Sequence, residues 1–314
     1  MIGRALYTGL LLAGVASTPV ATANVADAAT APIALHTTAG MMPLDDSLLG
    51  RSGKLRARFV PASQAKEFEL ALGVMRAAPP ATGLRARVAA LNVLPIVPFD
   101  MKVRGRMGLY RMGFWPGERH TVRSGAYDNP LGFIEVTPAN QDMQVSEHFT
   151  LRDFVTKDQS AVWPKYVVLR EALVDKLELV IDELQRMGHP VRHVQVMSGF
   201  RHPFYNEQGV GRGGRARESR HQYGDASDIF VDNNGDGVMD DLDGDGRVTL
   251  KDSDLIILAV ERVEMAHPEL TGGMGRYHAT NAHGPFVHVD VRGTPARWGG
   301  AQAHATRADR RHTG

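Results

Sequence analysis

The chain contains no cysteine among its 314 residues. This absence excludes a disulfide framework, a thiolate nucleophile and a zinc site with cysteine ligands. It also excludes a lipid anchor attached to an N-terminal cysteine. Any transition-metal site in the protein must therefore be built from histidine, aspartate or glutamate side chains.

A strong net charge and a long apolar segment are also missing. The formal net charge is +1, so the protein has no global field that would attract nucleic acid, and we predict no nucleic-acid partner. The most apolar run, Leu6 to Ala16, is too short to cross a bilayer as a helix, and no later run is longer. We therefore predict a soluble chain without a membrane span.

The N-terminal residues have the order of an export signal. Arg4 precedes the apolar run, and Ala21-Thr22-Ala23 then matches the A-x-A pattern of signal peptidase sites. We predict a signal peptide over residues 1–23 and a periplasmic or secreted protein. The alternative is a frayed apolar helix at the start of a cytosolic protein.

The segments that follow differ in composition. Residues 24–54 are rich in Ala, Thr and Pro without periodicity, which predicts a linker. Residues 55–137 contain short β-like runs separated by Pro and Gly, which predicts a small β-rich domain. We interpret its cations as solvated strand faces, with contact to an anionic cell wall as the alternative; they are Lys102, Arg104, Arg106, Arg111 and Arg119. Residues 301–314 are polar and basic, which predicts a disordered tail.

Residues 138–300 have clearer patterns and predict an α+β fold, an antiparallel sheet flanked by helices. Thr150 is placed to cap a short helix over Leu151–Val155. Apolar residues at helical spacing predict two longer helices, over Tyr166–Met187 and Ser253–His267. Strands are predicted over Val191–Ser198, Ala226–Val231 and Pro285–Val291.

Histidine and aspartate lie beside two of these strands. Strand alternation places His288 and Asp290 on the face opposite the neighbouring valines, and Asp228 opens a strand shortly after His221. Two histidines and one aspartate would give zinc three protein ligands and leave a fourth position for water. That arrangement suits hydrolysis, because zinc lowers the pKa of water and polarises a carbonyl. Chance proximity remains the alternative at this point.

Longer motifs favour the metal site. Ser219 to Asp228 fits the pattern S-x-H-x-x-G-x-A-x-D, and the strand containing His288-Val289-Asp290 follows it. Ser198-Gly199-Phe200-Arg201 and Tyr205-Asn206 precede it. Together these motifs, within residues 138 to 298, resemble the zinc D-Ala-D-Ala carboxypeptidase family. That family includes murein endopeptidases and the D-Ala-D-Ala dipeptidases of vancomycin resistance, and it shares a fold with Hedgehog.

The resemblance implies specific roles. It implies that His221, Asp228 and His288 bind zinc, and that Arg201 and Ser219 hold the substrate. A charge-assisted bond to a carboxylate or carbonyl would suit Arg201. For this arginine, a salt bridge within the fold is the alternative.

The sequence departs from the family pattern at the position of the general base. Many relatives place Glu, Asp or His two or three residues before the last zinc ligand, where this chain has Phe286 and Pro285. We predict His283 as the base, because a neutral imidazole suits proton transfer near neutral pH. The alternative is a histidine in a surface loop. Asp290 is a candidate for orienting His288 instead.

An acidic insertion over residues 232–252 has the spacing of an EF-hand-type calcium loop, and its exit helix resembles that of a dockerin. The predicted ligands are Asp241, Asp243, Asp245, the carbonyl of Arg247, and Asp252 in place of the usual Glu. The same register occurs nine residues earlier, which adds Asp232, Asn234, Asp236 and Asp240. We predict structural Ca2+ here, and a flexible acidic loop is the alternative.

Three functions fit these observations. We predict a zinc-dependent peptidoglycan peptidase, a D,D- or L,D-carboxypeptidase or endopeptidase, whose partners are the stem peptides of the cell wall. The missing acid before His288 supports a second hypothesis, a non-catalytic wall-binding or sensing module stabilised by calcium. A calcium-dependent adhesion or scaffold component is the third.

Overall fold

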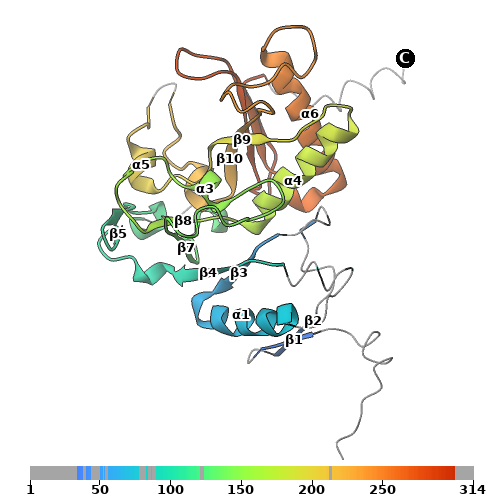
Figure 1. Ribbon diagram of the computed structural model, residues 1–314. Coiled ribbons are helices and arrows are strands. Elements are labelled where there is room, and N and C mark those ends of the chain that lie inside the picture. Colours follow the sequence, from blue (N-terminus) through green and yellow to red (C-terminus); the bar gives the residue numbers. More distant parts are fainter. Residues whose placement is uncertain are drawn as a thin grey trace, which may run out of the picture.

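The computed structural model describes residues 34–37, 40–43, 50–51, 53, 56–77, 83, 86, 90–120, 124–211 and 214–300. They form an α+β fold, as the sequence predicts (Figure 1). The predicted signal peptide and the predicted tail lie outside the described residues. No helix in the described ranges is long and apolar enough to cross a membrane.

A five-stranded sheet has the order β13-β11-β12-β10-β9. The three pairings among β11, β12, β10 and β9 are antiparallel as expected, and β13 adds a parallel edge strand. Every residue of β10 and β12 is buried, because these strands are covered on both faces. The strands are β9 (Val194–Ser198), β10 (Ala226–Val231), β11 (Gly273–Tyr277), β12 (Phe286–Asp290) and β13 (Ala296–Trp298).

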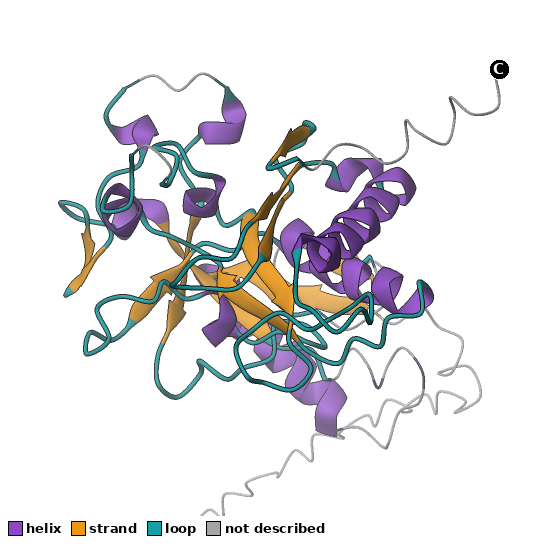
Figure 2. Cartoon of the chain, turned by 90° about the horizontal axis from the view of Figure 1, so that it is seen from above, coloured by secondary structure: helices purple, strands orange, loops and turns teal. Residues whose placement is uncertain are grey.

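Two long helices, α4 (Glu171–Arg186) and α6 (Leu250–Ala266), pack against each other, and α6 contacts β11 and β12. Figure 2 shows the helices beside the central strands. The helix predicted from Tyr166 begins five residues later, because Tyr166 lies in β8 (Lys165–Val167). Aromatic and β-branched residues favour this strand, which pairs with β7.

Helix α6 begins earlier than predicted, at Leu250 rather than Ser253. Thr249 and Asp252 form a capping box: Asp252 Oδ2 accepts the amide of Thr249 at 2.7 Å. Helix α3 (Leu151–Phe154) has the equivalent box with Thr150 and Asp153, close to its predicted bounds. Capping signals therefore set the starts of both helices.

A second sheet has the order β3-β4-β7-β8 and is mixed, with β3 and β4 parallel. Its strands are β3 (Arg58–Pro61), β4 (Val93–Pro98), β7 (Gly132–Val136) and β8. The segment 55–137, predicted as a small β-rich domain, contains β3, β4 and β7 and also a helix that the sequence patterns did not predict, α1 (Ala62–Ala77), with 16 residues. Its apolar residues do not form a clear stripe, so the helical pattern in this segment is weak.

The remaining elements are short. The predicted linker contains β1 (Ala34–Thr37) and β2 (Gly40–Pro43), which pair, and β1 contacts α1. Helix α5 (Pro203–Glu207) precedes the motif Ser219–Asp228. A small hairpin joins β5 (Arg106–Met107) and β6 (Tyr110–Arg111). Short 3₁₀ turns are η3 (Phe99–Met101), η4 (Pro116–Glu118), η5 (Gly125–Tyr127), η6 (Arg220–Tyr223) and η7 (Pro268–Leu270).

One hydrophobic core joins the two sheets. It extends from Leu94 and Phe133 in the second sheet through Leu173 of α4 to Val287 and Val289 in β12. The strands that carry the candidate metal ligands, β10 and β12, thus lie within this core. Dense packing on both sides limits how far their side chains can move.

Candidate metal centre

The three predicted zinc ligands come together in the structure. His221 lies in η6, Asp228 in β10 and His288 in β12. Asp228 is directly opposite His288 in the antiparallel register of β10 and β12. Directly opposed residues on one sheet face have side chains close enough to share a ligand.

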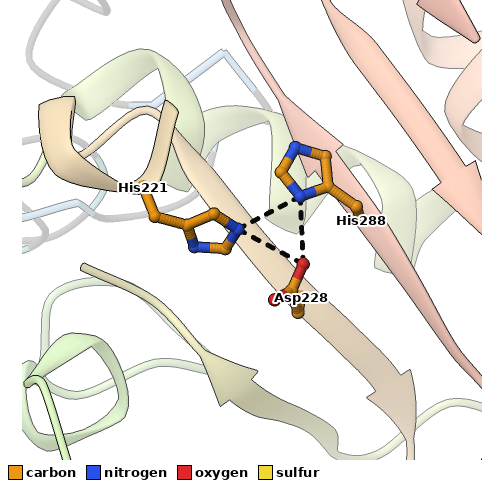
Figure 3. A group of neighbouring side chains, drawn as sticks. All are labelled: His221, Asp228 and His288. Atoms are coloured by element: carbon orange, nitrogen blue, oxygen red, sulfur yellow. Dashed lines mark hydrogen bonds and ion pairs between the residues drawn. The ribbon is translucent and has the colours of Figure 1, made fainter. Parts of the chain in front are cut away.

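The distances among the ligand atoms fit a tetrahedral zinc ion (Figure 3). His221 Nε2 lies 3.1 Å from His288 Nδ1 and 3.3 Å from Asp228 Oδ1, and His288 Nδ1 lies 3.0 Å from Asp228 Oδ1. Ligand atoms about 2.0–2.1 Å from a tetrahedral zinc ion are about 3.3 Å apart. The donor set of two imidazoles and one carboxylate is also one that zinc prefers.

Each imidazole is held by its other ring nitrogen. His221 Nδ1 donates to the carbonyl oxygen of Gly199 at 2.7 Å, which leaves the lone pair on Nε2. His288 Nε2 is 3.0 Å from Asp290 Oδ2, which leaves Nδ1 toward Asp228. Such acceptors fix the tautomer and the ring orientation of metal-binding histidines. The geometry supports the predicted orienting role of Asp290.

Asp290 is itself tightly held. Its carboxylate accepts bonds from the amide of Gly273 at 2.7 Å and from Arg292 Nε at 2.9 Å. Its main-chain carbonyl accepts a bond from Lys176 Nζ at 2.8 Å, and Lys176 also bonds Glu264 at 2.7 Å. A buried network thus ties the end of β12 to α4 and α6.

The trio has the electrostatics of a cation site. Burial lowers the pKa of His221 to about 4, so its ring is neutral at neutral pH. Burial alone would raise the pKa of Asp228, but His221 and Arg201 hold it well below its usual range. Burial alone would lower the pKa of His288, yet bonds with Asp228 and Asp290 raise it. The two carboxylates therefore favour a positive charge at His288. A proton on the ring can supply this charge, and so could a divalent cation bound to it.

Arg201 reaches the trio from the loop after β9. Its Nη2 forms an ion pair with Asp228 Oδ2 and lies 3.0 Å from His221 Nε2, while Nε donates to Ser198 Oγ at 2.7 Å. The salt bridge within the fold, one of the two predicted roles, is therefore present. The side chain also lines the cleft described next, which leaves it available to a substrate group.

The trio lies in a cleft of about 790 Å³. The predicted site residues Ser219 and His283 line the same cleft. His283 Nδ1 donates to the carbonyl of Gly284 at 2.8 Å, which leaves Nε2 as the ring nitrogen not engaged by this bond. Tyr205, part of the Tyr205-Asn206 motif, also lines the cleft. Further lining residues, which belong to no predicted motif, are Lys157, Arg215, Glu218, Tyr277 and Trp298.

Trp298 packs against His288 because of a glycine. Gly275 is the register partner of His288 on β11, and a Cβ at this position would lie 2.1 Å from Trp298 Nε1. The missing side chain lets the indole come within 5.0 Å of the His288 ring, centroid to centroid. The indole Nε1 donates to Tyr277 Oη at 2.9 Å. These aromatic groups form one wall of the cleft.

The acidic insertion contains two copies of one loop conformation. Asp232 accepts the amides of residues 235, 236 and 237, and Asp241 accepts those of residues 244, 245 and 246. The φ angles of the paired glycines agree, at 74° for Gly235 and Gly244. The sequence register that repeats after nine residues is therefore a structural repeat.

Within the second copy, Asp241, Asp243 and Asp252 place carboxylate oxygens within 4.8 Å of one another. Asp245 lies apart from this group and forms an ion pair with Lys251 Nζ at 2.7 Å. Asp252 is buried and caps α6, a role that the calcium interpretation did not include. Asp252 therefore stabilises the start of α6 whether or not a cation is bound.

Comparisons of the chain with protein-family models, with curated proteins and with solved structures give no match. The family resemblance of the motifs therefore stays a prediction.

Proposed function

We propose that the protein is a zinc-dependent peptidase that hydrolyses amide bonds in the stem peptides of peptidoglycan. The observation that carries this proposal is the His221–Asp228–His288 trio, with donor atoms 3.0 to 3.3 Å apart in an open cleft. Structural zinc sites are closed by four protein ligands, whereas three ligands in a cleft are typical of catalytic zinc. The cell-wall substrate rests on the motif resemblance.

Each residue of the cleft has its own role in the proposed hydrolysis. Zinc, when bound, supplies Lewis-acid polarisation of a carbonyl and activates water. Arg201 and Ser219 hold the peptide, with the guanidinium directed at a carboxylate or carbonyl oxygen. His283 accepts and returns a proton through Nε2, because its Nδ1 is engaged by Gly284.

We propose calcium as a structural ion of the acidic insertion. The carboxylates of Asp241, Asp243 and Asp252 converge within 4.8 Å, where like charges repel unless a cation joins them. The insertion leaves β10 shortly after Asp228 and leads into α6. Calcium would thus stabilise the connection between a zinc ligand and the helix that supports β12.

The second candidate is a non-catalytic module that binds peptidoglycan through the same cleft. The observation that favours it is the presence of Pro285 and Phe286 where an acid or base would be expected. Neither side chain can accept a proton. In this case the trio would hold zinc without efficient hydrolysis.

Digestion of purified peptidoglycan separates the two candidates. The zinc-loaded protein should release new muropeptides, identified by mass spectrometry, and a chelator should abolish them. Loss of one terminal residue would indicate a carboxypeptidase, and division of cross-linked dimers an endopeptidase. Retention on peptidoglycan with no change in any muropeptide mass would instead support the binding module.

A further inference from the structure

The small hairpin of β5 and β6 presents apolar and basic side chains together at the molecular surface. Of the ten large apolar side chains exposed in the described part of the chain, five lie between residues 101 and 131. Leu109 is 79% exposed at the turn of the hairpin, and Val103, just before it, is 65% exposed. Clusters of exposed apolar side chains mark interaction surfaces more often than single ones do.

Cations surround these apolar groups. Arg106 and Arg111 are direct register partners across the hairpin, and both are exposed. Like charges in this position destabilise a two-stranded ribbon. Among the described residues, no carboxylate forms an ion pair with either arginine or with the exposed Arg104. An anionic partner would relieve this repulsion.

The hairpin is fixed to the body of the protein, so its tip has a defined position. The guanidinium of Arg111 stacks on the Phe204 ring of α5 at 3.8 Å. Gln159 bonds both the amide and the carbonyl of Arg111, each at 2.9 Å. The amide of Phe204 donates to the carbonyl of Met112 at 2.8 Å. Figures 1 and 2 show the hairpin at the edge of the molecule, away from α4 and α6.

We propose that this tip, formed by Val103, Arg104, Arg106, Leu109 and Arg111, binds the surface of an anionic lipid bilayer. Leu109 and Val103 would enter the boundary between headgroups and acyl chains, and the arginines would contact lipid phosphates. An anionic polymer would satisfy the arginines but leave both apolar side chains in water. The mixture of side chains therefore favours lipid. This proposal does not depend on the zinc site.

Vesicle flotation tests the proposal with the full chain. The protein should float with vesicles of phosphatidylcholine and phosphatidylglycerol in equal parts, but not with phosphatidylcholine alone, and added salt should weaken binding. Leu109→Ser should lower the partition coefficient about tenfold. Arg104→Asn should lower it about fivefold. Asparagine suits this position because the φ angle of Arg104 is 50°.

Matched controls lie elsewhere on the surface. Leu70→Ser removes an apolar side chain of α1 that is 71% exposed, and Arg186→Gln removes one exposed cation of α4. Neither should alter flotation, and none of the four variants should alter hydrolysis of soluble muropeptides.

Three results would overturn the lipid assignment. The first is equal flotation with neutral vesicles, and the second is equal loss in the control variants. The third is vesicle binding that persists in the Leu109→Ser variant and is displaced by soluble polyphosphate. That result would assign the tip to an anionic polymer.

Discussion

Asp228 and His288 face each other across two neighbouring antiparallel strands, with Oδ1 of one 3.0 Å from Nδ1 of the other. The register of β10 and β12 places these two residues directly opposite each other. Both strands are fully buried, which limits movement of the pair. His221 completes the trio from η6, just before β10. The geometry of the candidate metal site is thus set mainly by strand pairing, and only its third residue, His221, depends on a turn.

The first prediction concerns zinc retention. His221→Ala and His288→Ala should each lose the metal and the peptidase activity together, because two protein ligands rarely retain zinc. Elemental analysis of the purified variants measures the stoichiometry. His189→Ala, a histidine outside the cleft, is the matched control and should keep one zinc per chain. Full zinc content in either ligand variant would exclude the assigned trio.

The second prediction concerns the residue behind the metal ligand. Asp290→Asn should weaken zinc binding by about 10- to 100-fold, because the carboxylate orients His288 and increases its basicity. The amide oxygen can still accept the bond from Gly273, so the strand end should persist. Competition with a chromophoric chelator measures the affinity. Unchanged affinity would show that β12 alone holds the His288 ring in place.

Sequence patterns predicted the site better than they predicted its surroundings. The motif residues identified the trio because strand alternation and spacing act over a few residues, and β10 occupies the predicted range Ala226–Val231. Alternation also placed Asp290 on the same face as His288, and Asp290 Oδ2 lies 3.0 Å from His288 Nε2. Trp298 and Lys157 line the cleft without any local signal, because their positions depend on long-range packing.

The errors also have physical causes. Helix α1 was missed because its apolar residues lack a clear stripe, and Tyr166 was assigned to a helix although it pairs in β8. Asp252 was interpreted only as a calcium ligand, although its pairing with Thr249 is the sequence signature of a helix start. For Tyr166 and Asp252, a second pattern overlapped the first in the same residues.

The third prediction addresses proton transfer. His283→Ala should lower turnover by about 10²- to 10⁴-fold, the usual contribution of a positioned base, while zinc stays bound. His278→Ala, an exposed histidine of the same loop region, is the control and should retain turnover. Single-turnover kinetics with a soluble muropeptide measures the effect. Normal turnover in the His283 variant would assign the proton transfer to another group of the cleft.

The fourth prediction concerns the buried network behind β12. Lys176→Met should lower the free energy of unfolding by about 3–5 kcal/mol, because the buried Glu264 would keep only its ion pair with Arg297 and the carbonyls of Leu270 and Asp290 would lose their buried donor. Lys66→Met on the exposed side of α1 is the control and should cost little. Urea denaturation measures both. The double variant Lys176→Met with Glu264→Gln should be less destabilised than the sum of the single variants. Strict additivity would show that the two side chains are not coupled.

The last prediction concerns calcium and stability. If the acidic insertion binds calcium, unfolding of the zinc-loaded protein should become less favourable by RT ln(1 + [Ca2+]/Kd), about 2.7 kcal/mol at a hundredfold excess over Kd. The melting temperature should therefore rise with added calcium. Asp243→Asn is the sharpest variant, because its side-chain oxygen can still accept the amide of Asp245 while the charge is lost. It should reduce the calcium-dependent rise and leave the calcium-free melting temperature nearly unchanged.

Asp142→Asn, which removes an exposed carboxylate paired with Arg152, is the control for net charge and should keep the full rise. Magnesium at the same concentration should have a smaller effect, because magnesium demands near-octahedral geometry at shorter metal–oxygen distances than calcium does. Equal rises in the parent chain and in the Asp243→Asn variant would mean that calcium acts elsewhere. No rise in the parent chain would mean that Asp241, Asp243 and Asp252 serve only the backbone amides that they already accept.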